Sequence, residues 1–151
     1  MTTEATPLIS DTGAESGHDR VMLIETDNVR SVEYDWGAIK WICDRKVTPN
    51  SLQSFGYAYV LPGKTNPEHR HRTCEEIIYM LAGELKVYAH GETITLKPGQ
   101  TALIPQGVRH MVVNEGWEPV LYIASFSAAF RDTVFKGTTG KLDLDAFEKL
   151  H

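Results

Sequence analysis

Two histidines and two glutamates gather in the stretch PEHRHRTCEE, residues 67–76. Side chains alternate between the two faces of a β-strand, so His69 and His71 share a face if this stretch is extended. Two imidazoles at that spacing can bind one metal ion, because imidazole is a ligand for several divalent transition metals. A carboxylate could supply a third bond, and both Glu75 and Glu76 are candidates. The stretch therefore predicts a metal site.

Alternate residues of the following strand face opposite sides, so the two glutamates differ in their surroundings. Glu76 shares a strand face with Ile78 and Met80. If that face lines the interior of a β-structure, its apolar neighbours keep water away from Glu76, and Glu75 then lies in the exposed turn. Parity therefore gives Glu76 the drier surroundings, although both glutamates remain candidates on this ground alone.

A third histidine, His110, begins an apolar β run directly after a turn, in PQGVRHMVVN, residues 105–114. On a strand it shares a face with Val112 and Asn114. An imidazole at that place carries a polar ring into the interior, where the ring needs a partner. His110 is therefore the candidate for a further metal ligand.

These residues need a frame of strands to hold them. Between residues 21 and 126, short apolar runs such as SFGYAYV and PVLYIASF alternate with turns that contain Gly, Pro or Asn. Many short strands with regular turn signals predict an all-β sandwich or barrel. Residues 1–20 are polar and predict a flexible tail. Residues 127–151 predict a C-terminal extension with a short helix, for which Asp143 is a suitable N-cap.

Composition narrows the class of protein. The chain has 151 residues, enough for one domain with its own core, and a net charge of −5. This mildly acidic balance lacks the electrostatic footprint of a nucleic-acid or anionic-membrane binder. No apolar run is long enough to span a bilayer. The N-terminus lacks the basic start and apolar core of a signal peptide, so we expect a cytoplasmic protein.

Two stretches in the middle of the chain together resemble the two motifs of the cupin family. Residues 63–83, GKTNPEHRHRTCEEIIYMLAG, are similar to the first motif: Gly, five residues, His-x-His, three or four residues, Glu, six residues, Gly. Residues 99–114, GQTALIPQGVRHMVVN, are similar to the second: Gly, five residues, Pro-x-Gly, two residues, His, three residues, Asn. The motifs stand in the family's order and are separated by a short spacer of 15 residues.

This resemblance implies both a fold and a site. The implied fold is a small cupin-type jelly-roll β-barrel over residues 21–126. The implied site is one divalent transition metal per chain, with four ligands: His69, His71, Glu76 and His110. Glu76 is selected over Glu75 because it satisfies the spacing to both neighbouring motif positions. The resemblance also implies that Asn114 bonds backbone and that five residues shape turns: Gly63, Gly83, Gly99, Pro105 and Gly107.

Ligand chemistry narrows the metal and the substrate. Three neutral imidazoles and one carboxylate suit Fe(II), which we favour, as well as Mn, Ni, Co, Zn and Cu. One divalent ion and one carboxylate leave a net charge of about +1, which favours an anionic or chelating small-molecule substrate.

Cupins serve many chemistries, so the fold does not give the function. We expect a metal-dependent dioxygenase acting on a small enol, diketone or aromatic diol. The alternatives are a non-redox isomerase, lyase or decarboxylase that uses the metal as a Lewis acid, and a binding module without chemistry. Proton transfer would need a nearby acid or base, and the candidates are Glu76, Tyr57 and Tyr59.

The segment VEYDWGAIKWICD, residues 32–44, does not read clearly as strand or helix. Its tryptophans, Trp36 and Trp41, could pack on the barrel or on a second subunit. Small barrels expose sheet edges that a partner can cover. We therefore expect a homodimer in which this segment is the cover, exchanged between subunits.

Overall fold

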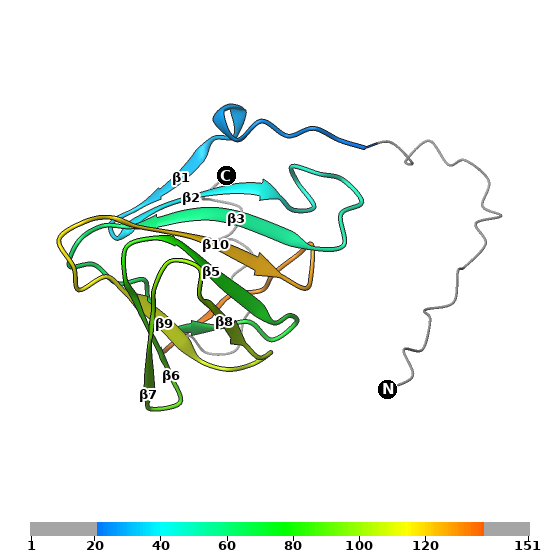
Figure 1. The fold of residues 1–151 in the computed structure, drawn as a ribbon. Helices are drawn as coiled ribbons and strands as arrows, with labels where there is room; N and C mark the ends of the chain where they lie inside the picture. Colours follow the sequence, from blue (N-terminus) through cyan, green and yellow to red (C-terminus); the bar gives the residue numbers. More distant parts are fainter. Residues whose placement is uncertain (1–20, 138–151) are drawn as a thin grey trace, which may run out of the picture.

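The computed structural model describes residues 21–137, and within them the chain is almost entirely β-structure (Figure 1). Eleven strands form two antiparallel sheets, and the only helical piece of the described residues is the 3₁₀ turn η1 (Thr26–Asn28). The all-β prediction is confirmed. The predicted tail at residues 1–20 and the predicted helix near Asp143 lie outside the described residues.

The larger sheet has six strands in the order β1-β2-β3-β10-β5-β8. Its strands are β1 (Ser31–Tyr34), β2 (Gly37–Cys43), β3 (Ser54–Val60), β10 (Val120–Phe126), β5 (Glu76–Ala82) and β8 (Thr101–Ile104). The smaller sheet has five strands in the order β11-β4-β9-β6-β7. Its strands are β11 (Val134–Phe135), β4 (His69–Arg70), β9 (His110–Val113), β6 (Leu85–Ala89) and β7 (Glu92–Leu96).

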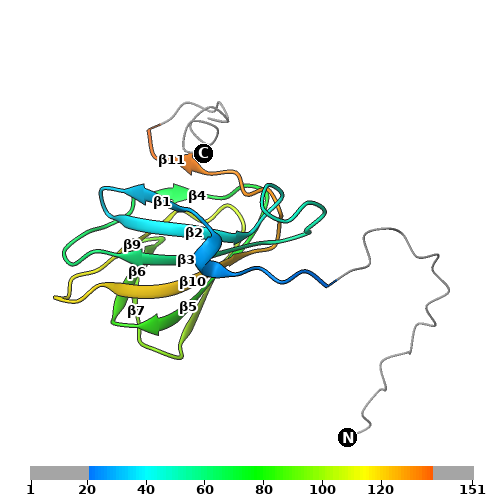
Figure 2. The ribbon, with the colours of Figure 1, turned by 90° about the horizontal axis from the view of Figure 1, so that it is seen from above.

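Strands that are distant in the sequence pair within each sheet, as a jelly roll requires. β10 lies between β3 and β5, and β4 pairs with both β9 and β11. Figure 2 shows β11 beside β4, its partner in the smaller sheet. The chain therefore crosses repeatedly between the two sheets, and the motif residues arrive at the interior from both.

The core fills the space between the sheets. Alternate residues of β3, β5 and β10 are buried, which is the period of strands with one face on a core. The most deeply buried apolar side chains are Val60, Ile78, Met80, Leu85, Val112 and Val120. Burial of such side chains stabilises a fold by about 1.5–3 kcal/mol each.

Both tryptophans of the ambiguous segment belong to this core. The segment forms the β1–β2 hairpin, and the exposed fractions of Trp36 and Trp41 are 6% and 8%. The ring of Trp41 lies over Gly56 of β3, where an added Cβ would come within 2.8 Å of the indole. Glycine in the middle of β3 thus makes room for the ring. The described structure does not support the expectation that these tryptophans cover another subunit, because they cover their own barrel.

No helix in residues 21–137 is long and apolar enough to cross a membrane.

Candidate metal centre

Four buried side chains converge inside the barrel from both sheets. His69 lies on β4, His71 just after it, His110 at the start of β9, and Glu76 at the start of β5. His69 and His110 are directly opposite each other in the β4–β9 pair. The four exposed fractions lie between 2% and 8%, and the candidate ligand atoms all lie within 4.8 Å of one another. This cluster could hold one metal ion.

Backbone carbonyls fix the orientation of all three imidazoles. The Nδ1 atom of His69 lies 2.7 Å from the Pro67 carbonyl oxygen, and that of His110 lies 3.0 Å from the Val108 carbonyl. The Nδ1 atom of His71 lies 2.6 Å from the carbonyl of residue 132. A carbonyl only accepts, so each Nδ1 carries the proton and each Nε2 is left with a lone pair. This is the arrangement in which histidine binds metals.

The interior nitrogens and Glu76 leave a place for a cation. Glu76 Oε2 lies 2.9 Å from His110 Nε2 and 3.3 Å from His71 Nε2. His71 Nε2 is nevertheless buried without a hydrogen bond among the described residues. Lone pairs of three imidazoles and a carboxylate that face one another need a proton or a metal between them. The residues therefore fit a divalent metal.

The electrostatics of the cluster point the same way. Burial lowers the pKa of His69 to about 4, and the neighbouring His110 and His71 act in the same direction. Burial alone would raise the pKa of Glu76, but His110 and His71 hold it below its usual range. Burial lowers the pKa of His110, but the Glu76 carboxylate outweighs this and raises the pKa, because it would accept a hydrogen bond from Nε2 once that atom is protonated. Glu76 is therefore an anion in a dry interior, which a cation would stabilise.

The match to known proteins covers the same strands. The family model of the cupin domain matches residues 56–126, which contain all four cluster residues and both motifs. Residues 56–126 are therefore identified as a cupin domain. The resemblance of the two motifs is thereby confirmed, and the predicted jelly-roll fold is that of the family.

Relatives and solved structures place this cupin among diverse proteins. A rhicadhesin receptor from Pisum sativum is 36% identical over 89 residues, which is 56% of this chain and 40% of the receptor. Polyketide synthase CurC from Streptomyces cyaneus is 38% identical over 73 residues, 48% of this chain and 47% of CurC. The cupin chain thus spans about half the length of the curated relatives it matches, or less.

The structure of the polyketide cyclase RemF from Streptomyces resistomycificus has a TM-score of 0.68 and 17% identity to this cupin. The superposition covers 85% of this chain and 94% of RemF. At that identity the likeness shows a common fold.

A second set of contacts, which the sequence did not indicate, holds the His71 segment in place. Asp132 accepts hydrogen bonds from the backbone N–H groups of Arg72 and Thr73, from Arg72 Nε and from the Thr73 hydroxyl. Its own carbonyl accepts from His71. Burial would raise the pKa of Asp132, but Arg72 and Thr73 lower it. The Gly107 N–H donates to the His71 carbonyl at 2.7 Å, which ties the two motifs together.

Apolar groups wall the cluster. The ring of Phe126 meets the His71 ring edge-on at 5.0 Å, and Ile78 and Ile104 are buried nearby on β5 and β8. Cys74 is also buried, and burial raises its pKa to about 11, so it is a packing residue more than a nucleophile. The interior faces of both sheets therefore exclude water from Glu76.

The structure sorts the remaining predicted residues by face. Glu75 is exposed and Glu76 is buried, as strand parity predicted. Tyr57 and Tyr59 lie on the face of β3 opposite the buried Ala58 and Val60. They therefore point away from the barrel interior, and the structure does not bring them to the cluster.

A different tyrosine faces inward. Tyr122 on β10 is buried at 4% exposure. Burial raises its pKa, and the charge of Glu76 adds to the effect. The alternation of β10 was the available signal, since Tyr122 shares a face with Ala124 and Phe126. Asn114, as expected, donates to backbone carbonyls, those of Val60 and Glu118.

Proposed function

We propose that this cupin is a metal-dependent enzyme acting on a small organic substrate that carries anionic or chelating oxygen atoms. The observation that carries the proposal is the buried cluster of three oriented imidazoles and one carboxylate. When bound, a divalent metal would supply Lewis acidity and, if redox-active, electrons to dioxygen. The chain itself orients the ligands, keeps Glu76 ionised and excludes water. The names of CurC and RemF are consistent with enzymes among the relatives.

The first reaction class is that of a dioxygenase with Fe(II). His69, His71, Glu76 and His110 would hold the metal, which would supply the redox chemistry of such a reaction. The apolar walls formed by Phe126, Ile78 and Ile104 would protect reactive species from water. Glu76, as the only carboxylate in the cluster, would be the group that accepts a proton from the substrate.

A second class, non-redox isomerase, lyase or decarboxylase chemistry, is favoured by Tyr122. Burial raises the pKa of its hydroxyl, so the hydroxyl stays protonated and can donate a hydrogen bond to a substrate oxygen. With Glu76 as proton acceptor and Tyr122 as hydrogen-bond donor to the enolate oxygen, the interior would hold a pair of groups that enolisation can use.

Elemental analysis of protein purified without chelators or added metal tests the proposal. We expect about one divalent metal per chain, by the count of one four-residue cluster. Oxygen uptake is then measured with the loaded protein and a panel of enols, diketones and catechols. Uptake that depends on substrate supports the dioxygenase. Substrate loss without uptake supports the non-redox class. Metal-dependent ligand binding without turnover would make this cupin a binding module, and absence of metal would contradict the whole proposal.

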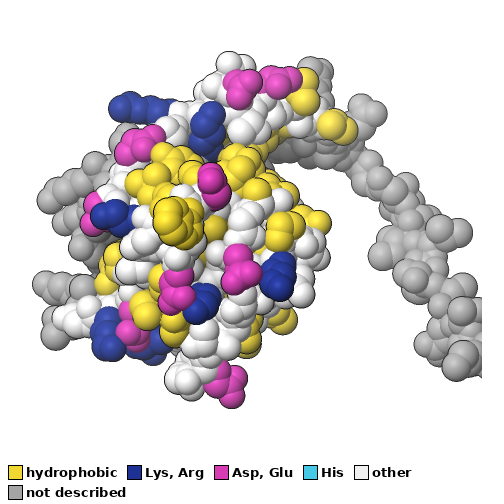
Figure 3. Space-filling view, turned by 60° about the vertical axis from the view of Figure 1, so that its left-hand side comes forward, with side chains coloured by type: hydrophobic (Ala, Val, Ile, Leu, Met, Phe, Trp, Pro, Cys, Tyr) yellow, Lys and Arg dark blue, Asp and Glu magenta, His cyan; other side chains and the backbone are white. Residues whose placement is uncertain are grey.

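We also infer a homodimer, with the outer face of the six-stranded sheet as its surface. This face carries a continuous set of apolar side chains that are exposed or half-buried: Phe55, Tyr57, Tyr59, Ile77, Tyr79, Leu81, Leu103, Leu121 and Ile123. Figure 3 shows the molecule from a side on which hydrophobic side chains also gather, with charged side chains around them. An apolar face of this extent is unusual for a monomer, and the same face of a second copy would match it by two-fold symmetry.

Light scattering at micromolar concentration checks the dimer. The variant Ile77→Glu should be a monomer, because it places a charge on the apolar face. Trp117→Glu is the matched control, since Trp117 is 95% exposed in the loop before β10. A wild-type monomer would refute the dimer.

A further inference from the structure

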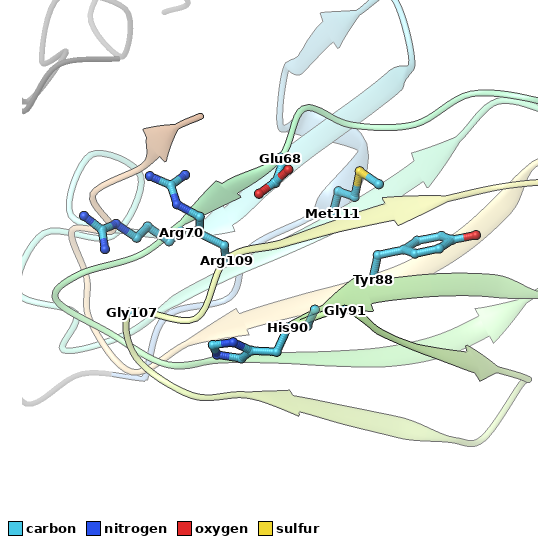
Figure 4. Close-up of a pocket in the computed structure, with 9 residues that line it drawn as sticks. Glu68, Arg70, Tyr88, His90, Gly91, Gly107, Arg109 and Met111 are labelled. Atoms are coloured by element: carbon cyan, nitrogen blue, oxygen red, sulfur yellow. The ribbon is translucent and has the colours of Figure 1, made fainter. Parts of the chain in front are cut away.

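A cavity lies on the outer face of the five-stranded sheet, on the far side from the metal centre. Its volume is about 430 Å³. Its walls include Arg70 on β4, Arg109 just before β9, and Met111 on β9 (Figure 4). Strand alternation explains the placement: His69 and His110 point into the barrel, so their neighbours Arg70 and Arg109 point out of it.

Two arginine nitrogens in this cavity have no partner. Arg70 Nε and Arg109 Nη1 are buried, and neither makes a hydrogen bond within residues 21–137. Neither arginine forms an ion pair with any residue in that range. A buried charged donor left unsatisfied is costly, so such donors in a protein call for a bound acceptor. Figure 4 shows both side chains extending to the same side, away from Tyr88 and Met111.

The cavity's own acidic group is already engaged. Glu68 is the only carboxylate in the lining, and its Oε2 lies 2.8 Å from Lys136 Nζ. The Tyr88 hydroxyl donates to Glu115 at 3.3 Å, away from the arginines. The lining therefore presents two guanidinium groups that are always charged, against one carboxylate that is already paired.

We propose that this cavity binds a small oxyanion, a carboxylate or phosphate group, through Arg70 and Arg109. The planar guanidinium presents parallel N–H donors that match two oxygens of such a group. The anion would satisfy the two buried nitrogens and balance two like charges on adjacent strands. Nothing in this argument depends on the metal centre, so the two sites can be tested separately.

Isothermal titration with inorganic phosphate and with acetate tests the site, with chloride added to keep ionic strength constant. We expect saturable binding of one anion per cavity. Arg70→Gln and Arg109→Gln should each weaken binding by about tenfold or more, the loss of one charge-assisted hydrogen bond. Arg30→Gln, which removes the same charge from an exposed position, should bind like the wild type. Tighter binding of phosphate assigns a phosphate ligand, and tighter binding of acetate assigns a carboxylate.

Met111→Glu keeps the test decisive if an arginine variant fails to fold. It leaves both arginines in place and puts a competing carboxylate in the cavity, so phosphate and acetate should both bind more weakly. If neither anion binds beyond chloride, water satisfies the donors and the proposal is wrong. Equal affinity in Arg70→Gln, Arg109→Gln and Arg30→Gln would also overturn it, because the anion would then lie elsewhere, for instance at the metal.

Discussion

His69 on β4 and His110 on β9 point into the barrel, whereas Arg70 on β4 and Arg109 just before β9 point out of it. Inside, the Nδ1 atoms of His69 and His110 meet backbone carbonyls within 3.0 Å. Outside, Arg70 and Arg109 keep buried nitrogens that no described residue meets. Adjacent residues on the same two strands are thus fully oriented on one face and unsatisfied on the other.

The two faces differ in what orients their side chains. The inner site is preorganised by local backbone geometry, because the carbonyls of Pro67 and Val108 lie two residues before the rings they accept from. A metal that arrives there meets ligands that are already aimed. The outer site has its donors but no acceptor, so its order would come with the ligand. The predictions below remove the features that separate the two faces.

Removing one inner imidazole should have the largest effect. His71→Ala or His110→Ala should abolish stoichiometric metal binding, because each deletes one of four donors that converge in a buried space. Metal content after dialysis against a buffer without chelator measures this. His90→Ala is the control, since His90 is exposed on the outer side. Full metal content in either inner variant would contradict the assignment of the ligands.

Removing the hydroxyl of the inner Tyr122 and that of the outer Tyr57 should have different effects on kcat. Tyr122→Phe should lower kcat by about 100-fold with metal content unchanged, the contribution expected of one hydrogen-bond donor to a developing negative charge. Tyr57→Phe removes the same hydroxyl from the outer face and should leave kcat unchanged. The measurement uses the first substrate that the screen identifies. A loss of kcat in Tyr57→Phe and none in Tyr122→Phe would restore the expectation drawn from the sequence.

The sequence predicts the inner site better than its surroundings, for a physical reason. Strand alternation and motif spacing are local, and they place His69, His71 and the buried Glu76 on interior faces. The contact of Asp132 with His71 joins residues 61 apart, and no local pattern marks it. The alternation of residues in β3 would have been enough to predict that Tyr57 and Tyr59 face outward.

The outer cavity could not be predicted from the sequence, for a different reason. Alternation does predict that Arg70 points away from the histidines. Whether an arginine on the outer face finds a carboxylate depends on tertiary neighbours, and here Glu68 is paired with Lys136. The unsatisfied state of Arg70 and Arg109 is therefore visible only once the fold is known.

Loosening the support of the inner face should have a smaller effect than removing a ligand. Asp132→Asn loses the charge that binds Arg72 Nε at 2.9 Å while keeping the size of the side chain. We expect metal release to a chelator about tenfold faster, as for other groups behind ligands, and a loss of stability of about 2 kcal/mol. Asp27→Asn, in the exposed η1 turn, is the control. Unchanged release kinetics would show that the backbone alone holds His71.

The smallest expected effect is that of anion binding on the outer face on metal release from the inner face. β4 has two residues and meets β9 through a single register pair, His69 with His110. An anion held by both Arg70 and Arg109 would link these strands from outside, so it should slow metal release from inside. We expect about a fivefold decrease in the release rate at saturating phosphate, at the low end of coupling between sites. In Arg109→Gln the decrease should vanish, whereas Arg30→Gln should retain it. Equal release rates in wild type with and without bound phosphate would mean that the two faces are independent, even though the same strands carry both.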